Sequence, residues 1–215
     1  MASRSAPPPP TRVLFVRHGQ TPTTGAVLPG RAPGLHLSDA GRGQAEAAAA
    51  RIAGLKRVDA VYASPMERTR ETAAPIARAR GLRVRVDKGL LEADFGEWTG
   101  RKLSDLRRLR AWKAVQQHPS GFRFPGGESF AEMQTRVVSA TRRLCARHAG
   151  GTVVVVSHAD PIKAAVNDAL GAHLDQFQRI VISPCSISAL AWSPSGPIAL
   201  TVNSTGGPLT ELVPS

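Results

Sequence analysis

An Arg-His-Gly tripeptide at residues 17–19 is the part of the sequence best suited to chemistry. It directly follows residues 13–16 (V-L-F-V), a β-branched and aromatic run of the kind that forms a buried strand. Arg17 places a fixed positive charge beside His18, whose imidazole can act as a nucleophile, and Gly19 lets the backbone approach a ligand closely. An unpaired cation at the end of a buried strand is costly, so we predict that an anion binds here.

Groups of the same kind are associated with two further predicted strands and one loop. The helix after the strand at residues 58–63 carries Arg68 in its first turn, and the apolar strand at 152–156 (T-V-V-V-V) is followed by His158. A loop carries Glu92. Because the carboxyl ends of parallel strands meet at one edge of a sheet, we expect two arginines, two histidines and one carboxylate to converge there.

These residue types favour a phosphoryl group as the ligand. The planar guanidinium of arginine binds phosphate oxygens in a bidentate manner. Phosphoryl transfer depends mainly on positioning and on stabilising negative charge, and fixed cations supply both. The histidines have no cysteine or carboxylate at metal-ligand spacing, which favours nucleophilic attack over zinc binding. We therefore expect catalysis without a metal ion and without a cofactor.

The elements that must position these groups alternate between strands and helices. Strands are expected at residues 13–16, 58–63, 82–86, 152–156, 186–192 and 198–203, the third near the sheet edge, and helices at 39–55, 65–80, 103–117, 128–148 and 161–171. We interpret Ser64 as the cap of the second helix and Asp160 as the cap of the fifth. The alternation predicts an α/β fold, a three-layer sandwich in which helices flank a mostly parallel central sheet.

Length and composition restrict the class of protein. Of the 215 residues, we expect 11–215 to form one domain after a disordered, Pro-rich segment at 1–10 that has no apolar signal region. No apolar run reaches the ~20 residues that span a bilayer. Two cysteines give no disulfide framework, which fits a cytoplasmic protein. The net charge is +12, but the arginines are scattered and aromatic residues make up only 5%, so nucleic acid is not favoured as a partner.

The motifs resemble those of the histidine phosphatase superfamily, which includes the cofactor-dependent phosphoglycerate mutases. The matching stretches, in the family's order, are R-H-G-Q-T at 17–21, G-R at 30–31, L-S-D-A-G-R-G-Q-A at 37–45, S-P-M-E-R-T-R-E-T-A at 64–73, L-L-E-A-D-F-G-E-W-T-G at 90–100, P-G-G-E-S at 125–129 and V-S-H-A-D-P-I at 156–162. The resemblance covers nearly the whole chain after Pro10. It implies a phosphoglycerate mutase-like fold and metal-independent chemistry on a phosphomonoester.

Carried over residue by residue, the resemblance implies a role for each group of the site. His18 would be the nucleophile that forms a phosphohistidine. Glu92 would protonate the leaving oxygen and then activate the attacking water. Arg17, Arg68 and His158 would bind the phosphoryl oxygens. Further contacts with substrate are expected from Gly19, Thr24, Gly30, Arg31, Lys102 and Ala159.

Two positions depart from the usual pattern of the family. Thr24 stands where the family usually has Asn, and Ala159-Asp160 stands where Gly-Gly is common. Asp160 is an alternative proton donor, because some acid phosphatases of the superfamily carry Asp directly after the second histidine. Its position before Pro161 favours the helix cap.

Several functions remain open on the sequence alone. A phosphatase acting on a small phosphorylated metabolite is favoured over a mutase. The known mutases of the family carry a longer insertion and a tail that covers the pocket, whereas the insertion at residues 103–124 and the tail after Gly207 are short and leave water access to the site. A phosphoglycerate-type phosphomutase is the main alternative. A basic nucleic-acid-binding module or a non-catalytic module is more remote. The identity of the substrate and the formation of a homodimer stay undetermined.

Overall fold

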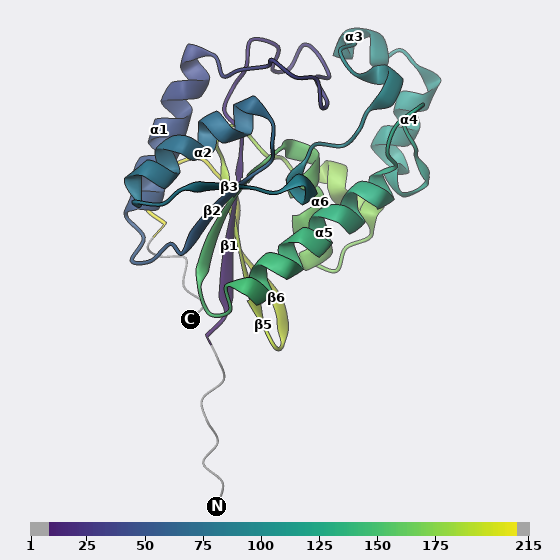
Figure 1. Cartoon of the computed structure of the whole chain (residues 1–215). Coiled ribbons are helices and arrows are strands. Elements are labelled where there is room, and N and C mark those ends of the chain that lie inside the picture. Colours follow the sequence, from purple (N-terminus) through teal and green to yellow (C-terminus); the bar gives the residue numbers. More distant parts are fainter. Residues whose placement is uncertain (1–8, 210–215) are drawn as a thin grey trace, which may run out of the picture.

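The computed structural model describes residues 9–209, which are organised around a six-stranded sheet (Figure 1). Side by side, the strands are β3 (Val84–Val86), β2 (Ala60–Ala63), β4 (Thr152–Ser157), β1 (Thr11–Arg17), β5 (Ile187–Ser193) and β6 (Gly196–Ser204). The first four are parallel, whereas β5 is antiparallel to β1 and β6 is antiparallel to β5. The predicted mostly parallel sheet, with β3 at its edge, is confirmed.

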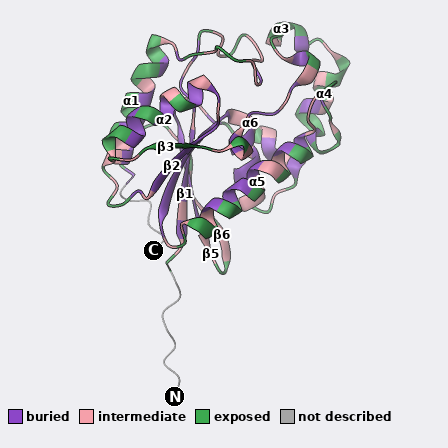
Figure 2. Cartoon of the chain, viewed as in Figure 1, coloured by how far each residue is buried: buried purple, intermediate pink, exposed green. Residues whose placement is uncertain are grey.

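Helices cover both faces of this sheet, because the strands point apolar side chains into two separate cores. One face carries α1 (Asp39–Ala53) and α2 (Glu67–Ala79), and the other carries α5 (Phe130–Arg147) and α6 (Ala159–Ala169). In β4, Val153 and Val155 pack into the core beneath α5 and α6. Val154 and Val156 point to the other face and pack into the core beneath α1 and α2. All of β4 is buried (Figure 2), as expected of a strand covered on both faces. The predicted three-layer sandwich is confirmed.

The sequence predicts one continuous helix at residues 103–117, and this prediction is wrong because the structure has two helices there. The structure divides it into α3 (Leu103–Leu106) and α4 (Arg110–Gln117), and the backbone between them leaves helical geometry. The turn brings the ring of Trp112 onto that of Trp98, with 6.2 Å between centroids. Burial of this aromatic contact outweighs the helical preference of the residues at the break, because propensity is a weak determinant beside packing.

The starts of two helices also differ from those predicted, and both lie at strand ends. α2 begins at Glu67, so Ser64 does not cap it. α6 begins at Ala159 with His158 as its N-cap residue, which places Asp160 inside the first turn. Both predicted caps are therefore wrong. Ser64 instead bonds through Oγ to His158, and Asp160 pairs with Lys163 of the same helix.

Short elements complete the described part of the chain. Its 3₁₀ helices are η1 (Lys88–Leu90), η2 (Gly96–Trp98), η3 (Pro119–Gly121) and η4 (Leu174–Arg179). Except for its last two residues, the Pro-rich segment at 1–10 lies outside the described residues, and its disorder stays a prediction. Between residues 9 and 209, no helix has the length and apolar character needed to cross a membrane.

Candidate active site

The carboxyl ends of adjacent parallel strands bring the two histidines together. Arg17 at the end of β1 is in register with Ser157 at the end of β4. The next residue, His18, donates its backbone N–H to the carbonyl oxygen of Ser157 at 3.0 Å. As a result, the rings of His18 and His158 lie 5.3 Å apart between centroids, in an edge-to-face arrangement at 65°.

The imidazole of His18 is held in its neutral form, the form in which a ring nitrogen can act as a nucleophile. Its Nδ1 lies 2.8 Å from the carbonyl oxygen of Gly19, and because a carbonyl only accepts hydrogen bonds, Nδ1 carries the proton. The lone pair of the ring is therefore on Nε2. Burial, followed by the charges of Arg68 and Arg17, lowers the pKa of His18 to about 3. The ring is thus uncharged at neutral pH.

Close packing around Gly19 fixes the position of the preceding residue, His18. A Cβ atom at Gly19 would lie 2.5 Å from the carbonyl oxygen of Gly41 in α1, a distance that real Cβ atoms do not adopt. The N–H of Gly19 donates to Oγ1 of Thr72 in α2 at 3.0 Å. The contacts of Gly19 with α1 and α2 therefore hold His18 in place. A contact between Gly19 and substrate stays a prediction.

Arg68 and His158 form a buried pair across the site. Arg68 Nη2 donates to the carbonyl oxygen of Gly30 at 2.8 Å and to His158 Nδ1 at 3.2 Å. Because a guanidinium only donates, Nδ1 of His158 accepts, and its Nε2 donates to Ser64 Oγ at 2.9 Å. Both side chains are fully buried. Burial, followed by the charge of Arg68, holds the pKa of His158 well below its ordinary value, so this ring is also neutral.

The two arginines of the site keep N–H donors without partners. Arg17 Nη1 donates to the carbonyl oxygen of Ile182 at 2.7 Å, but its Nε is buried without a hydrogen bond. Nε and Nη1 of Arg68 are also buried without a hydrogen bond. Burial lowers the pKa of both guanidiniums, and the charge of Glu92 opposes this effect. Buried N–H groups of a charged guanidinium cost free energy unless an anion accepts their hydrogen bonds, so this arrangement is suited to binding an oxyanion.

Glu92 lies near these arginines and retains a proton unusually well. Its exposed fraction is 8%. Burial, followed by the charge of Asp160, raises its pKa to about 7, against the opposing effect of the hydrogen bond from the Ala93 N–H to Oε1 at 3.0 Å. The preceding chain is fastened to β4, because Ser157 Oγ donates to the carbonyl oxygen of Leu90 at 2.7 Å. A carboxyl group that titrates near neutral pH can give a proton in one step and take one in the next.

Asp160 occupies the first turn of α6 instead of capping it. Its side chain is 18% exposed and lies 3.4 Å from Nζ of Lys163. Lys163 in turn donates to Oε1 of Gln178 at 3.0 Å. The negative charge of Asp160 is the second cause of the raised pKa of Glu92. Asp160 therefore favours the protonated form of Glu92 from a neighbouring element.

Gly30 and Arg31, both predicted to contact substrate, hold other residues of the site. Gly30 has φ of +52°, a conformation that favours glycine, and its carbonyl oxygen accepts from Arg68. Arg31 Nε donates to the carbonyl oxygen of Glu92 at 2.8 Å, and its Nη2 pairs with Glu128 at 2.8 Å. Both residues thus position groups of the site, and their direct contact with substrate stays a prediction.

The other predicted substrate contacts lie nearer the surface. Oγ1 of Thr24 accepts from the N–H of Thr21 at 2.8 Å, which closes the turn after β1. Lys102 is exposed directly before α3, and its backbone bridges to Val27. Ala159 is half-buried at the start of α6. Their contact with substrate also stays a prediction.

Three residues, Thr72, Glu128 and Arg136, support the site through roles that the sequence analysis does not predict. Thr72 Oγ1 accepts from Gly19 and donates to the carbonyl oxygen of Arg68 at 2.7 Å. Glu128 and Arg136 support the chain around Glu92. Two signals were present: Thr72 follows Arg68 by one helical turn, and Glu128 lies in the P-G-G-E-S motif.

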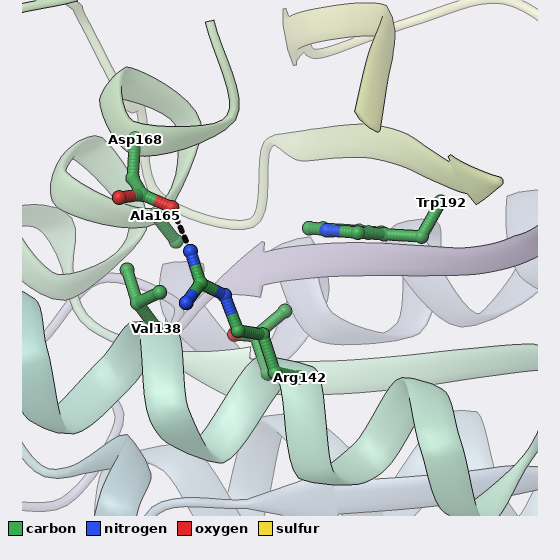
Figure 3. Close-up of a pocket in the computed structure, with 6 residues that line it drawn as sticks. Val138, Arg142, Ala165, Asp168 and Trp192 are labelled. Carbon is green, nitrogen blue, oxygen red and sulfur yellow. Dashed lines mark ion pairs between the residues drawn. The ribbon is translucent and has the colours of Figure 1, made fainter. Parts of the chain in front are cut away.

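A separate hollow between α5, α6 and β5 lies away from this site (Figure 3). Its lining residues are Val138, Thr141, Arg142, Ala165, Asp168 and Trp192, and Arg142 pairs with Asp168 at 3.6 Å. Trp192 is in register with Thr11 at the beginning of β1, whereas His18 follows the end of that strand. Across residues 9–209, no three His, Cys, Asp or Glu side chains gather as they would around a metal ion.

Comparison with known families tests the resemblance directly. The family model described as the histidine phosphatase superfamily, branch 1, matches residues 13–205. The chain belongs to the histidine phosphatase superfamily. The resemblance drawn from the motifs is thereby confirmed.

Members of the superfamily with similar sequence or structure include phosphatases. A bifunctional protein of Mycobacterium tuberculosis is 36% identical over an alignment of 209 residues that covers 92% of this chain and 55% of that protein. The chain thus spans about half the length of the first curated relatives that it matches. Phosphoserine phosphatase 1 of Hydrogenobacter thermophilus is 31% identical, over 90% of this chain and 92% of that protein. The native structure of a mycobacterial glucosyl-3-phosphoglycerate phosphatase has a TM-score of 0.81 at 25% identity, over 90% of this chain and 98% of the other.

Proposed function

We propose that this chain is a metal-independent phosphomonoesterase that acts through a phosphohistidine on a small phosphorylated metabolite. The observation that carries the proposal is the neutral, buried His18, which is close to two arginines with unpartnered buried N–H donors. The raised pKa of Glu92 supplies the second requirement, a group that exchanges protons near neutral pH. The two relatives named as phosphatases support the same reaction class.

In the first half-reaction, the phosphoryl oxygens accept hydrogen bonds from Arg17 Nε and from Nε and Nη1 of Arg68. Nε2 of His18 attacks phosphorus, and the bond between phosphorus and the ester oxygen breaks. The electron pair of that bond goes to the leaving oxygen, which takes the proton of Glu92. The arginines stabilise the charge that spreads over the phosphoryl oxygens during the transfer.

In the second half-reaction, water attacks the phosphohistidine. The carboxylate of Glu92 takes a proton from this water as its oxygen bonds to phosphorus. The bond between phosphorus and nitrogen breaks, and its electron pair returns to Nε2 of His18. Inorganic phosphate leaves, and the histidine is neutral again. For His158 to contact the phosphoryl group as well, its Nε2–H must move from Ser64 Oγ to a phosphoryl oxygen.

The segment at residues 101–113 supports a substrate whose leaving group carries its own negative charge. Its exposed cations are Arg101, Lys102, Arg107, Arg108, Arg110 and Lys113, against the single carboxylate of Asp105. None of them pairs with a carboxylate among residues 9–209. Backbone hydrogen bonds of 2.9 Å join the segment to residues 26–28, just before Gly30. Phosphoserine and phosphoglycerates, after which the two phosphatase relatives are named, carry a carboxylate close to the phosphoester.

A phosphomutase is the second candidate, because the superfamily contains phosphoglycerate mutases that form the same intermediate. The two activities differ in whether water or a bound hydroxyl takes the phosphoryl group from His18. The test is incubation with 3-phosphoglycerate and with phosphoserine, with and without 2,3-bisphosphoglycerate and a chelator. Isomer and free phosphate are followed together. We expect phosphate release that needs neither bisphosphate nor metal. Rapid, bisphosphate-dependent isomerisation with little free phosphate would overturn the phosphatase proposal.

A further inference from the structure

The backbone around Glu92 is held by two arginines, Arg31 and Arg136. Arg136 Nη1 donates to the carbonyl oxygens of Gly89 at 3.1 Å and Leu91 at 2.9 Å, and its Nη2 donates to that of Glu92 at 3.2 Å. Arg31 Nε donates to the same carbonyl oxygen of Glu92 at 2.8 Å. Both guanidiniums therefore converge on the peptide group of the residue proposed as proton donor.

One carboxylate joins these two arginines. Oε2 of Glu128 lies 2.8 Å from Arg31 Nη2 and 2.8 Å from Arg136 Nη2, and its Oε1 accepts from Arg136 Nε at 2.9 Å. The side chain of Glu128 is only 14% exposed, and those of the arginines are 29% and 22% exposed. A half-buried carboxylate with two bound guanidiniums is far more constrained than an exposed ion pair.

The backbone of Glu128 is tied to the same loop. Its N–H donates to the carbonyl oxygen of Asp94 at 2.9 Å, and Oε2 accepts from the N–H of Asp94 at 3.3 Å. A Cβ atom at the preceding residue, Gly127, would lie 2.3 Å from the Asp94 carbonyl oxygen, so the two chain segments touch. Contacts from Glu128 thus reach the loop through both arginines and through its own backbone.

We propose that Glu128 is a positioning residue that, by holding Arg31 and Arg136 against the carbonyl oxygen of Glu92, keeps the proton donor in its buried place beside the phosphoryl site. The inference rests on the proposed function, because it concerns the proton donor of that reaction. Without this carboxylate, the guanidiniums have no counter-charge and can turn toward water. The loop then loosens and Glu92 becomes hydrated. Since burial is the main cause of its raised pKa, that pKa falls.

The test compares Glu128→Gln with Glu132→Gln. Glu132 lies one turn further along the same region, is 51% exposed, and also binds an arginine, Arg123. It closes the capping box with Ser129, and among the described residues the hydrogen bonds of its side chain are with Arg123 and Ser129. Each variant loses one negative charge; Glu128→Gln loses its pairs with two arginines and Glu132→Gln its pair with one. The control therefore separates the loop contact from a general effect on charge or on the helix.

We expect Glu128→Gln to lower hydrolysis of an alkyl phosphate by about 10²-fold, because a misplaced catalytic group costs about that much. Hydrolysis of p-nitrophenyl phosphate, whose leaving group needs little protonation, should fall much less. The alkaline limb of the alkyl phosphate pH profile should move to lower pH. Glu132→Gln should leave all three measurements close to wild type. Equal losses on both substrates with an unmoved pH limb would overturn the proposal.

Hydrogen exchange provides a readout that does not depend on the proposed activity. We expect faster exchange of the amides at residues 89–98 in Glu128→Gln than in wild type or Glu132→Gln. Unchanged exchange there would overturn the positioning role even if no substrate is found. If Glu128→Gln does not fold, Arg136→Lys takes its place, because lysine keeps the charge but does not reach three carbonyl oxygens. Faster exchange in Arg136→Lys supports the proposal, and unchanged exchange contradicts it.

Discussion

Ser64 Oγ lies 2.9 Å from Nε2 of His158, and this hydrogen bond joins the ends of the neighbouring strands β2 and β4. Nδ1 of the same ring accepts from Arg68, so the two nitrogens of His158 are fixed by Ser64, directly after β2, and by Arg68, in the first turn of α2. The serine is thus an acceptor within the site rather than a helix cap. Through His158 it determines the tautomer that accepts the N–H of Arg68.

Replacement of Ser64 by alanine should leave the Nε2–H of His158 buried without an acceptor. A buried donor in this state costs about 1–3 kcal/mol, so we expect the free energy of unfolding to fall by that amount. kcat/KM should fall as well, because the orientation of Arg68 depends on His158. Urea unfolding and steady-state kinetics measure the two effects. Ser104→Ala is the control, since that hydroxyl is exposed and bonds only to Asp105. Equal behaviour of the two variants would refute the role of Ser64.

Replacement of His18 by alanine should abolish turnover while the protein stays folded. The reason is that Nε2 of this ring is the proposed nucleophile. Wild-type protein quenched during turnover should carry an acid-labile phosphoryl group on His18, detectable by mass spectrometry at neutral to alkaline pH. Thermal unfolding checks the integrity of the variant. Substantial phosphate release by a folded His18→Ala would exclude the mechanism.

Glu92, rather than Asp160, should be the main proton donor. Glu92→Gln should slow hydrolysis of alkyl phosphates by about 10²–10⁴-fold, the usual effect of losing a general acid. Aryl phosphates with good leaving groups should be affected much less. Asp160→Asn should have a much smaller effect, because the charge of Asp160 acts only by raising the pKa of Glu92. The assignment is wrong if the dependence on the leaving group appears in Asp160→Asn instead.

The titration of Glu92 should also be visible in stability. Its pKa in the folded protein is about 7, above the ordinary value of 4.5, so between these values the folded state holds a proton that the unfolded state has lost. Stability must therefore fall as pH rises through this window, by roughly 3 kcal/mol in total. Glu92→Gln lacks this titration, so its stability relative to wild type should increase from about pH 5 to about pH 8. A difference that stays constant over this range would show that the pKa is not raised.

The fold and the grouping of the candidate site residues were predictable because their signals are local. Each strand that leads into the site is a short apolar run, and the polar residue that follows it marks the sheet edge. β1 with His18 and β4 with His158 show this directly. The parallel arrangement follows from the alternation of strands and helices, and it is enough to bring these residues together.

The rest depends on contacts between distant segments, which no local pattern records. Ser64 has the sequence of a helix cap but bonds to His158, 94 positions further along the chain. Arg31 and Glu128 are 97 positions apart and meet behind Glu92. The break between α3 and α4 is likewise set by aromatic packing on Trp98. In each case tertiary contacts outweigh the local preference of the sequence.

The basic segment at residues 101–113 leads to a final prediction about substrate choice. Arg107, Arg108 and Arg110 are exposed around the break between α3 and α4. A cluster of like charge near a site raises the local concentration of oppositely charged ligands, and salt weakens the effect. Replacing the three arginines with glutamine should therefore lower kcat/KM for phosphoserine by about tenfold at low salt. The same variant should change kcat/KM much less for a phosphoester of an uncharged alcohol.

A matched control removes the same charge elsewhere. Lys56, Arg83 and Arg147 are exposed and precede the beginnings of β2, β3 and β4, at the edge of the sheet opposite His18. Their replacement with glutamine changes the net charge equally but leaves the basic segment intact. We expect this control to keep wild-type preference between the two substrates and the wild-type dependence of kcat/KM on salt. If both triple variants lose activity toward phosphoserine to the same extent, the effect comes from net charge alone, and the basic segment does not select the substrate.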